Sequence, residues 1–100
     1  MKEPVTITVD YKLKPEFVEA FCEVIPGVLP DTAKFAGFRD IKVVRHSSDR
    51  DRVLIVETWD DEESYRKYIA WRTERGDVSR LDAMLIYAKT DVWPEVVGRA

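Results

Sequence analysis

Residues 52–65 read RVLIVETWDDEESY, an apolar segment that runs directly into an acidic one. Its early part, VLIV, is apolar at every position, which is typical of a central strand covered on both faces. Asp60 and Glu63 follow with the spacing of a helix capping box, with Asp60 in the cap position. The pattern therefore predicts a strand over 52–59 and a helix over 60–75 that stops at a glycine.

Periodicity on either side of this stretch predicts the other elements. Apolar and polar residues alternate over 4–13, which predicts a strand with one apolar face. A helix is expected to start at Pro15, and Pro26-Gly27 must kink or break it. The remaining predicted elements are a short helical piece over 30–35, a strand over 38–47, a turn over 48–51, a short helix capped by Asp77, and a strand over 86–93.

The second and third predicted strands form a hairpin, because the segment between them is polar and turn-like. A turn centred on Asp49-Arg50 places Val43 opposite Val56 and Lys42 opposite Glu57. This register joins an apolar residue to an apolar residue and a base to an acid, which favours it.

The order strand, helix, strand, strand, helix, strand predicts a ferredoxin-like α+β fold, βαββαβ, in a single domain over 1–100. Its antiparallel sheet carries the helices on one face. Because the strand over 52–59 is apolar on both sides, the other face needs a partner as well. A second copy of the chain is the expected partner, and a solvent-exposed apolar face is the alternative.

Composition excludes several function classes. The chain has 100 residues, of which 45% are hydrophobic and 35% are charged, and a net charge of −3, which gives no basic surplus for a nucleic-acid binder. With one histidine and one cysteine, a single chain cannot build a zinc site from such ligands.

We expect Cys22 to be a reduced, buried thiol. With no signal peptide and no membrane span expected, we expect a cytoplasmic protein.

Common catalytic motifs are absent, so candidate site residues come from clustering. His46 is a candidate general base, and an exposed histidine at a strand end is the alternative. Tyr65, Tyr68 and Arg72 share one helix face, with Trp59 just before that helix. These side chains predict either a dry pocket with a few polar groups or amphipathic core residues with solvated tips.

Residues 57–65, ETWDDEESY, resemble the hallmark of the antibiotic biosynthesis monooxygenase family, in which a strand ending in Glu-x-Trp precedes an acidic cap and a helix. The segment 36–38, AGF, is similar to the family's entry to its second strand, and 68–76 is similar to a helix end in many members. The resemblance covers about residues 4–93.

This resemblance implies a homodimer whose sheets pack into a dimeric α/β barrel, with a pocket between sheet and helices in each subunit. It implies oxidation of aromatic phenols or quinols by O₂, with no flavin, haem or metal cofactor. Tyr68 stands where many members carry histidine, and the absence of histidine over 61–76 disfavours the haem-degrading branch. The expected catalytic residues are Trp59, Tyr68 and Arg72, the last holding a phenolate, and the expected substrate-binding residues are Tyr65, Phe21 and Ile55.

Three functions remain open on this fold. The first is a cofactor-independent monooxygenase that acts on a small aromatic quinol or polyketide-like phenol. The second is a non-enzymatic module that binds or senses a small ligand. The third is a related dimeric barrel enzyme of another reaction type, such as an isomerase or a dehalogenase. Fold alone does not choose between them.

Overall fold

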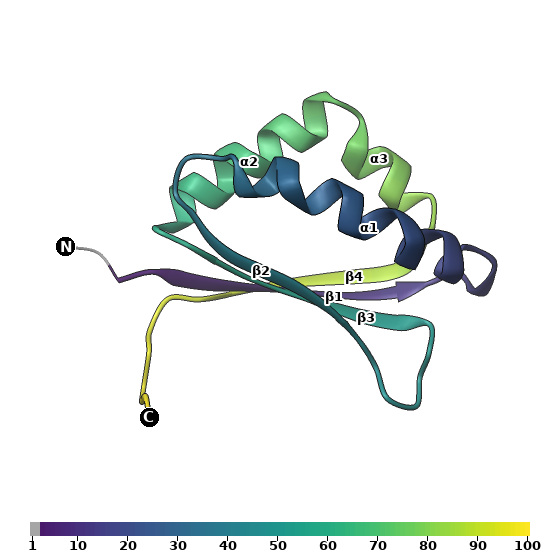
Figure 1. Cartoon of the computed structure of the whole chain (residues 1–100), viewed down its shortest axis with the longest axis horizontal. Coiled ribbons are helices and arrows are strands. Elements are labelled where there is room, and N and C mark those ends of the chain that lie inside the picture. The colour runs from purple at the N-terminus through teal and green to yellow at the C-terminus, as the bar shows by residue number, and fades with distance from the viewer. Residues whose placement is uncertain (1–2) are drawn as a thin grey trace.

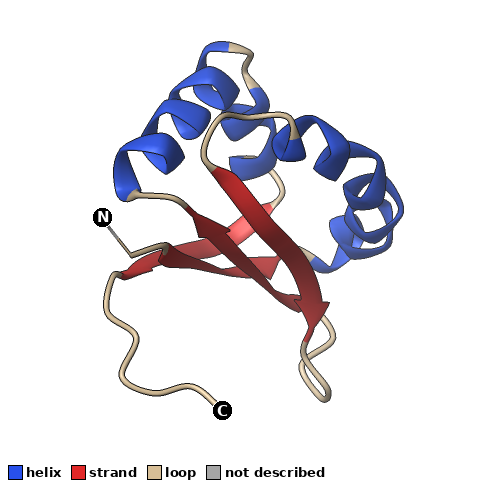
Figure 2. Ribbon diagram, turned by 60° about the vertical axis from the view of Figure 1, so that its left-hand side comes forward, coloured by secondary structure: helices blue, strands red, loops and turns tan. Residues whose placement is uncertain are grey.

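The computed structural model describes residues 3–100, which fold as one sheet beneath one layer of helices (Figure 1). The elements are β1 (Val5–Leu13), a 3₁₀ turn (Pro15–Phe17), α1 (Val18–Ala33), β2 (Phe38–Arg45), β3 (Arg52–Trp59), α2 (Glu62–Glu74), α3 (Asp77–Asp82) and β4 (Leu85–Trp93). The strands lie in the order β2-β3-β1-β4, and every neighbouring pair is antiparallel. The helices lie on one side of the sheet, as Figure 2 shows. The predicted ferredoxin-like α+β fold is confirmed.

The alternation of β1 sorts its side chains as predicted. Val5, Ile7, Val9 and Leu13 are buried on the side that carries the helices. Two hydrophobic clusters form on this side. The first gathers Val5, Ile7, Val9, Ile55, Trp59 and Tyr68, and the second gathers Leu13, Val18, Phe21 and Val53.

The hairpin register differs by one residue from the predicted one. Val43 pairs with Ile55 and Lys42 with Val56, so Glu57 lies opposite Ile41. The reason is the turn, because His46 Nδ1 accepts hydrogen bonds from the backbone N–H groups of Ser48 (3.1 Å) and Asp49 (2.9 Å). His46 is therefore an exposed turn residue in this fold, and its ring stabilises a loop that runs over 46–51 instead of 48–51.

Helix boundaries also correct the sequence prediction. The helix α1 continues through Pro26 and Pro30 as far as Ala33. Both prolines are exposed, so water can reach the carbonyl groups that lose their helical donors. Asp61, one residue later than predicted, caps α2 by accepting a hydrogen bond from the Ser64 N–H at 2.8 Å. Three smaller differences complete the corrections: β2 ends at Arg45, Gly76 rather than Asp77 is the N-cap of α3, and β4 starts at Leu85.

Gly37 holds the entry to β2 against the start of α2. Its φ is +87°, and a Cβ at this position would lie 2.3 Å from Ser64 Oγ. Its carbonyl accepts a hydrogen bond from the Asp60 N–H at 2.7 Å. Only glycine both adopts this positive φ readily and leaves room for the Ser64 side chain, so Gly37 fixes the position of the junction between β3 and α2.

We expect Gly37→Ala to destabilise the chain by about 1–3 kcal/mol, because the new methyl group forces Ser64 away and strains the backbone. Urea unfolding measures the effect. Gly27→Ala is the matched control, since Gly27 lies within α1 with open space around it. That change is expected to stabilise the chain by about 0.5–1 kcal/mol. Equal effects of the two substitutions would contradict this role of Gly37.

The sheet face that points away from the helices is partly apolar. Side chains of Val44, Leu54, Val56, Tyr87 and Trp93 lie on it, because directly paired residues share a face. Trp93 lies across β1 and donates a hydrogen bond from Nε1 to Thr8 Oγ1 at 2.8 Å. No element of residues 3–100 covers this face, which we call the open face (Figure 1).

Candidate functional site

A buried glutamate lies between the sheet and the helices. The alternation of β3 turns Ile55, Glu57 and Trp59 toward the helices, and Glu57 is only 4% exposed. Trp59 Nε1 donates to Glu57 Oε1 at 2.8 Å, which is the only hydrogen bond of this carboxyl group within residues 3–100. Burial raises the pKa of Glu57, and the Trp59 bond opposes that shift. The result is a carboxyl group whose basicity is higher than usual.

Aromatic rings surround the Glu57–Trp59 pair. The Trp59 ring is fully buried, with centroids 5.1 Å from Tyr68, 6.2 Å from Tyr65 and 5.5 Å from Phe38. Tyr68 is buried, while Tyr65 is half-buried. These rings form an aromatic surround for Trp59, the residue that holds the Glu57 carboxyl group.

Arg72 connects the three helices. Its Nε donates to the Tyr68 hydroxyl at 3.0 Å, and its Nη1 donates to Asp77 Oδ2 at 3.0 Å. Its Nη2 donates to the Val28 carbonyl (3.2 Å) and to Thr32 Oγ1 (3.1 Å). Four of the five N–H groups of a guanidinium are thus used inside the protein, which leaves one for a ligand.

Two tyrosine hydroxyls have no hydrogen-bond partner within the described residues. They belong to Tyr11 on β1 and Tyr65 on α2, and both rings pack against the first cluster. Burial raises the pKa of Tyr11, and Tyr65 and Glu57 add to the shift. Burial and Glu57 raise the pKa of Tyr65 in the same way. Both hydroxyls therefore stay protonated and can donate hydrogen bonds to a ligand.

The structure brings most of the sequence-predicted site residues together. Trp59, Tyr68 and Ile55 belong to one cluster, Tyr65 packs against it, and Arg72 bonds to Tyr68. Phe21 belongs to the second cluster.

Sequence reasoning missed Glu57 and Tyr11 as site residues. The available signal for Glu57 was a charged residue on the helix-facing side of an otherwise apolar strand. For Tyr11, the signal was a hydroxyl on the apolar face of β1.

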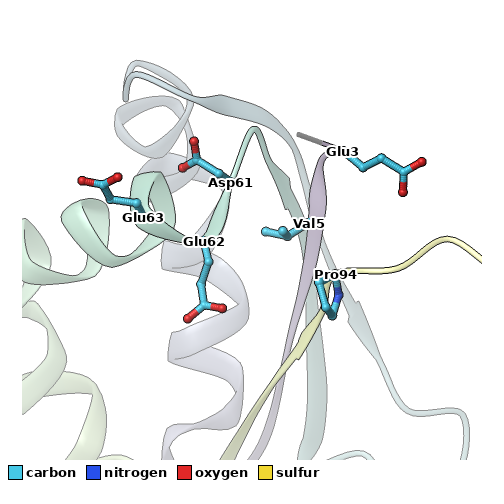
Figure 3. A pocket seen from close by; sticks show the side chains of 6 residues that line it. All are labelled: Glu3, Val5, Asp61, Glu62, Glu63 and Pro94. Atoms are coloured by element: carbon cyan, nitrogen blue, oxygen red, sulfur yellow. The ribbon is translucent and has the colours of Figure 1, made fainter. Parts of the chain in front are cut away.

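Two hollows on the surface of residues 3–100 are lined by other residues than the predicted site residues. One, of about 360 Å³, lies where β1 and α2 begin, and its carboxylates spread apart instead of converging (Figure 3). The other, of about 210 Å³, lies near the β2–β3 turn on the open face. No group of three His, Cys, Asp or Glu side chains within residues 3–100 could hold a metal ion. Over the same residues, no helix is long and apolar enough to cross a bilayer.

Fold and site define a ferredoxin-like α+β protein with a carboxyl group buried between sheet and helices. The chain belongs to the antibiotic biosynthesis monooxygenase family, whose model matches residues 4–72. No curated protein matches the sequence significantly.

Solved structures share this fold at low sequence identity. A conserved protein from Methanosarcina mazei Go1 is 19% identical, with a TM-score of 0.84 and 95% of each chain covered. A mutant of SnoaB, a cofactor-independent oxygenase from Streptomyces nogalater, is 14% identical with a TM-score of 0.80, covering 97% of this chain and 99% of the other. A candidate antibiotic biosynthesis monooxygenase from Nitrosomonas europaea is 14% identical with a TM-score of 0.74, covering 100% and 97%.

Proposed function

We propose that this chain is a cofactor-independent monooxygenase that oxidises an electron-rich aromatic phenol or quinol with O₂. The observation that carries the proposal is the buried Glu57 carboxyl group, held by Trp59 and surrounded by aromatic rings. Family membership and the fold shared with the oxygenase SnoaB support it. We place the reaction in the cytoplasm.

In this reaction the deprotonated substrate itself supplies the electrons to O₂. The protein therefore has to provide a base and hold the substrate ring in a fixed orientation. Glu57 takes a proton from the phenol, and the resulting anion is rich enough in electrons to reduce O₂. The anion transfers electrons to O₂ and one oxygen atom bonds to a ring carbon. The other oxygen leaves as water, with the hydrogens that the phenol loses. In the net reaction, a phenol and O₂ give a quinone and water.

Each predicted site residue takes a role in this proposal. Trp59 orients Glu57 through the indole N–H, while Tyr65 and Ile55 contact the substrate ring. Tyr68 and Arg72 act mainly by holding the aromatic surround in place, because their polar atoms are bonded to one another and to Thr32. Phe21 bounds the neighbouring cluster and contacts the ring of Tyr11.

Oxygen uptake tests the function directly. Purified protein with a panel of quinols and anthrone-like phenols should consume one O₂ per quinone formed, above the uncatalysed rate. A dependence on added flavin or iron would overturn the cofactor-free mechanism. No uptake, together with binding of the same compounds, would favour a ligand-binding module.

Trp59→Phe tests how Glu57 is held. The substitution removes the hydrogen bond that lowers the pKa of Glu57, so that pKa rises further. We expect kcat/KM to fall by roughly ten- to a hundredfold, and its rise with pH to move to higher pH. Trp71→Phe is the control, since Trp71 makes no hydrogen bond to Glu57. An unchanged pH profile in Trp59→Phe would argue against Glu57 as the base.

We propose that the open face pairs with a second copy of the chain. The apolar residues Leu54 and Val56 lie at its centre, and the charges Arg52 and Asp10 already pair with each other at 2.7 Å. Sedimentation should give about twice the chain mass of 11.6 kDa. Val56→Asp should shift the protein to the monomer, because it places a charge inside the interface. A wild-type monomer at high concentration would contradict this assembly.

A further inference from the structure

One edge of the sheet is open to pairing with another strand. β4 ends the strand order β2-β3-β1-β4, so the N–H and C=O groups of its outer edge have no strand partner within residues 3–100 (Figure 1). Such an edge is a template on which a second extended segment can add by hydrogen bonding. Proteins usually protect it with a bulge, a proline or charges of one sign.

The β2 edge of the sheet has this protection and the β4 edge lacks it. The register of β2 is irregular near its start. Its basic residues are Arg39, Lys42 and Arg45. By contrast, β4 pairs regularly with β1 from Tyr87 to Trp93, and this run carries one base, Lys89, and one acid, Asp91. Asp91 is half-buried and the rest of the run is exposed. The run is therefore available to a partner strand.

This run of β4 is complementary to itself. Residues 87–93 read YAKTDVW, with Thr90 in the middle. When two copies lie antiparallel about Thr90, an aromatic residue faces an aromatic one, an apolar residue faces an apolar one, and a base faces an acid. The opposed pairs are Tyr87 with Trp93, Ala88 with Val92, Lys89 with Asp91, and Thr90 with its own copy. Such a contact is isologous, as in a two-fold symmetric dimer.

The two ends of the run lead to the same centre. Before it, the register with β1 shifts and leaves Ile86 outside the regular ladder. After it, Pro94 has no backbone N–H group to donate. Two copies that pair along the whole regular run therefore meet at Thr90. Moving the centre by one residue would place Lys89 or Asp91 opposite its own copy, which like-charge repulsion disfavours.

Pairing about Thr90 is compatible with contact between the open faces. Directly opposed residues share a face, so both open faces lie on the same side of the combined sheet. Thr90 pairs with Val9, which pairs with Ile55, so the two-fold axis follows this row of the sheet. Leu54 and Val56 lie on either side of the row. As the twisted sheets fold toward each other, the same axis brings Leu54 toward the partner's Val56.

We propose that β4 pairs antiparallel with β4 of a second copy of the chain about Thr90, which joins the two sheets at one edge of the dimer. The proposal rests on the open-face pairing proposed above and specifies its register. Lys89 Nζ and Asp91 Oδ2 lie 3.7 Å apart within one chain. In the dimer the two pairs lie side by side, so four charges of alternating sign neutralise one another at the junction.

Charge substitutions test which residues oppose each other. Lys89→Asp brings acids together at the junction and Asp91→Lys brings bases together, so each variant alone should dimerise about tenfold more weakly in sedimentation. An equimolar mixture of the two should form a mixed dimer, because the acidic strand then opposes the basic one. Lys67→Asp and Glu63→Lys are matched controls, since they change the same charges in an exposed pair on α2. Both controls should dimerise like the wild type.

A disulfide locates the centre of the pairing. Directly opposed residues of an antiparallel pair have Cα atoms about 4.5–5.5 Å apart, which a disulfide can span. With Cys22→Ala in the background, Thr90→Cys should therefore oxidise to a covalent dimer. Ala88→Cys is the control and should stay unlinked, because it opposes the partner's Val92. Thermal melting verifies that each variant is folded.

The outcomes separate this proposal from the others. Full dimerisation of both charge variants, no mixed dimer, or equal crosslinking of Thr90→Cys and Ala88→Cys would reject the β4 pairing and leave the open-face dimer standing. A wild-type monomer at high concentration would reject both. A dimer that persists in Val56→Asp, together with crosslinking of Thr90→Cys, would support the β4 pairing and reject the open-face contact. None of these results depends on O₂ uptake, which tests the monooxygenase function separately.

Discussion

Glu57→Gln is expected to lower the rate constant of O₂ uptake by roughly a hundred- to ten-thousand-fold, because the amide cannot accept the substrate proton. Its oxygen can still accept the Trp59 hydrogen bond, so the site should keep its shape. An oxygen electrode under saturating quinol measures the change. Glu63→Gln, on the exposed side of α2, is the control and should leave the rate constant unchanged. Retained activity in Glu57→Gln would remove this carboxyl from the mechanism.

The same variant should differ from the wild type in the pH dependence of its stability. Burial raises the pKa of Glu57 above its ordinary value of 4.5, so the folded state prefers the neutral carboxyl group. Its contribution to stability is present below the unfolded pKa and is lost as pH rises through the folded pKa. Glutamine stays neutral throughout. The stability difference between Glu57→Gln and wild type, measured by urea unfolding, should therefore grow in favour of glutamine as pH rises from about 4.

Arg72→Ala is expected to destabilise the chain by about 2–4 kcal/mol and to lower Tm by roughly 10–25 °C. The substitution removes four hydrogen bonds and leaves the Thr32 hydroxyl, which is fully buried, with one partner fewer. It also removes the cation from the face of Trp71, 4.7 Å from the ring centroid. Chemical denaturation measures the free energy of unfolding.

Two further variants calibrate that result. Arg66→Ala removes another α2 arginine, which pairs with Glu62 at the surface, and should cost at most about 0.5 kcal/mol. Arg72→Lys keeps the charge but loses the planar fork, so it should recover only part of the lost stability. Similar losses in Arg72→Ala and Arg66→Ala would show that Arg72 does not hold the helices together.

Local periodicity was enough to predict the strands and their faces. The alternation in β1 assigned Ile7 to the apolar face, and Ile7 is fully buried. Pro26 was expected to kink or break its helix, and α1 continues through it without a break. Pro26 is exposed, so water can reach the carbonyl group that loses its helical donor, and that exposure depends on tertiary packing. The hairpin register was missed because a histidine side chain, not the backbone alone, fixed the length of the turn.

The candidate site was harder to predict than the fold for a related reason. Glu57 was visible in the Glu-x-Trp pattern, but its importance comes from having only Trp59 as a hydrogen-bond partner once it is buried. Tyr11 was predicted as an apolar-face residue, and only packing shows that its hydroxyl is left unbonded. By contrast, Arg72 was expected to serve a ligand, and the three-dimensional arrangement gives most of its N–H groups to neighbouring helices.

The three tryptophans of this chain lie in different environments, so their fluorescence can report separately on the core and on the open face. Trp59 is fully buried beside a carboxyl group, while the Trp71 ring packs against the guanidinium groups of Arg72 and Arg75. Trp93 is 55% exposed on the open face. Their fluorescence should separate into a blue component from Trp59 and a red component from Trp93. Quenching of the blue component on adding a phenol would report binding of the phenol between the sheet and the helices. A blue shift of the red component on concentrating the protein would report that a second copy of the chain covers the open face.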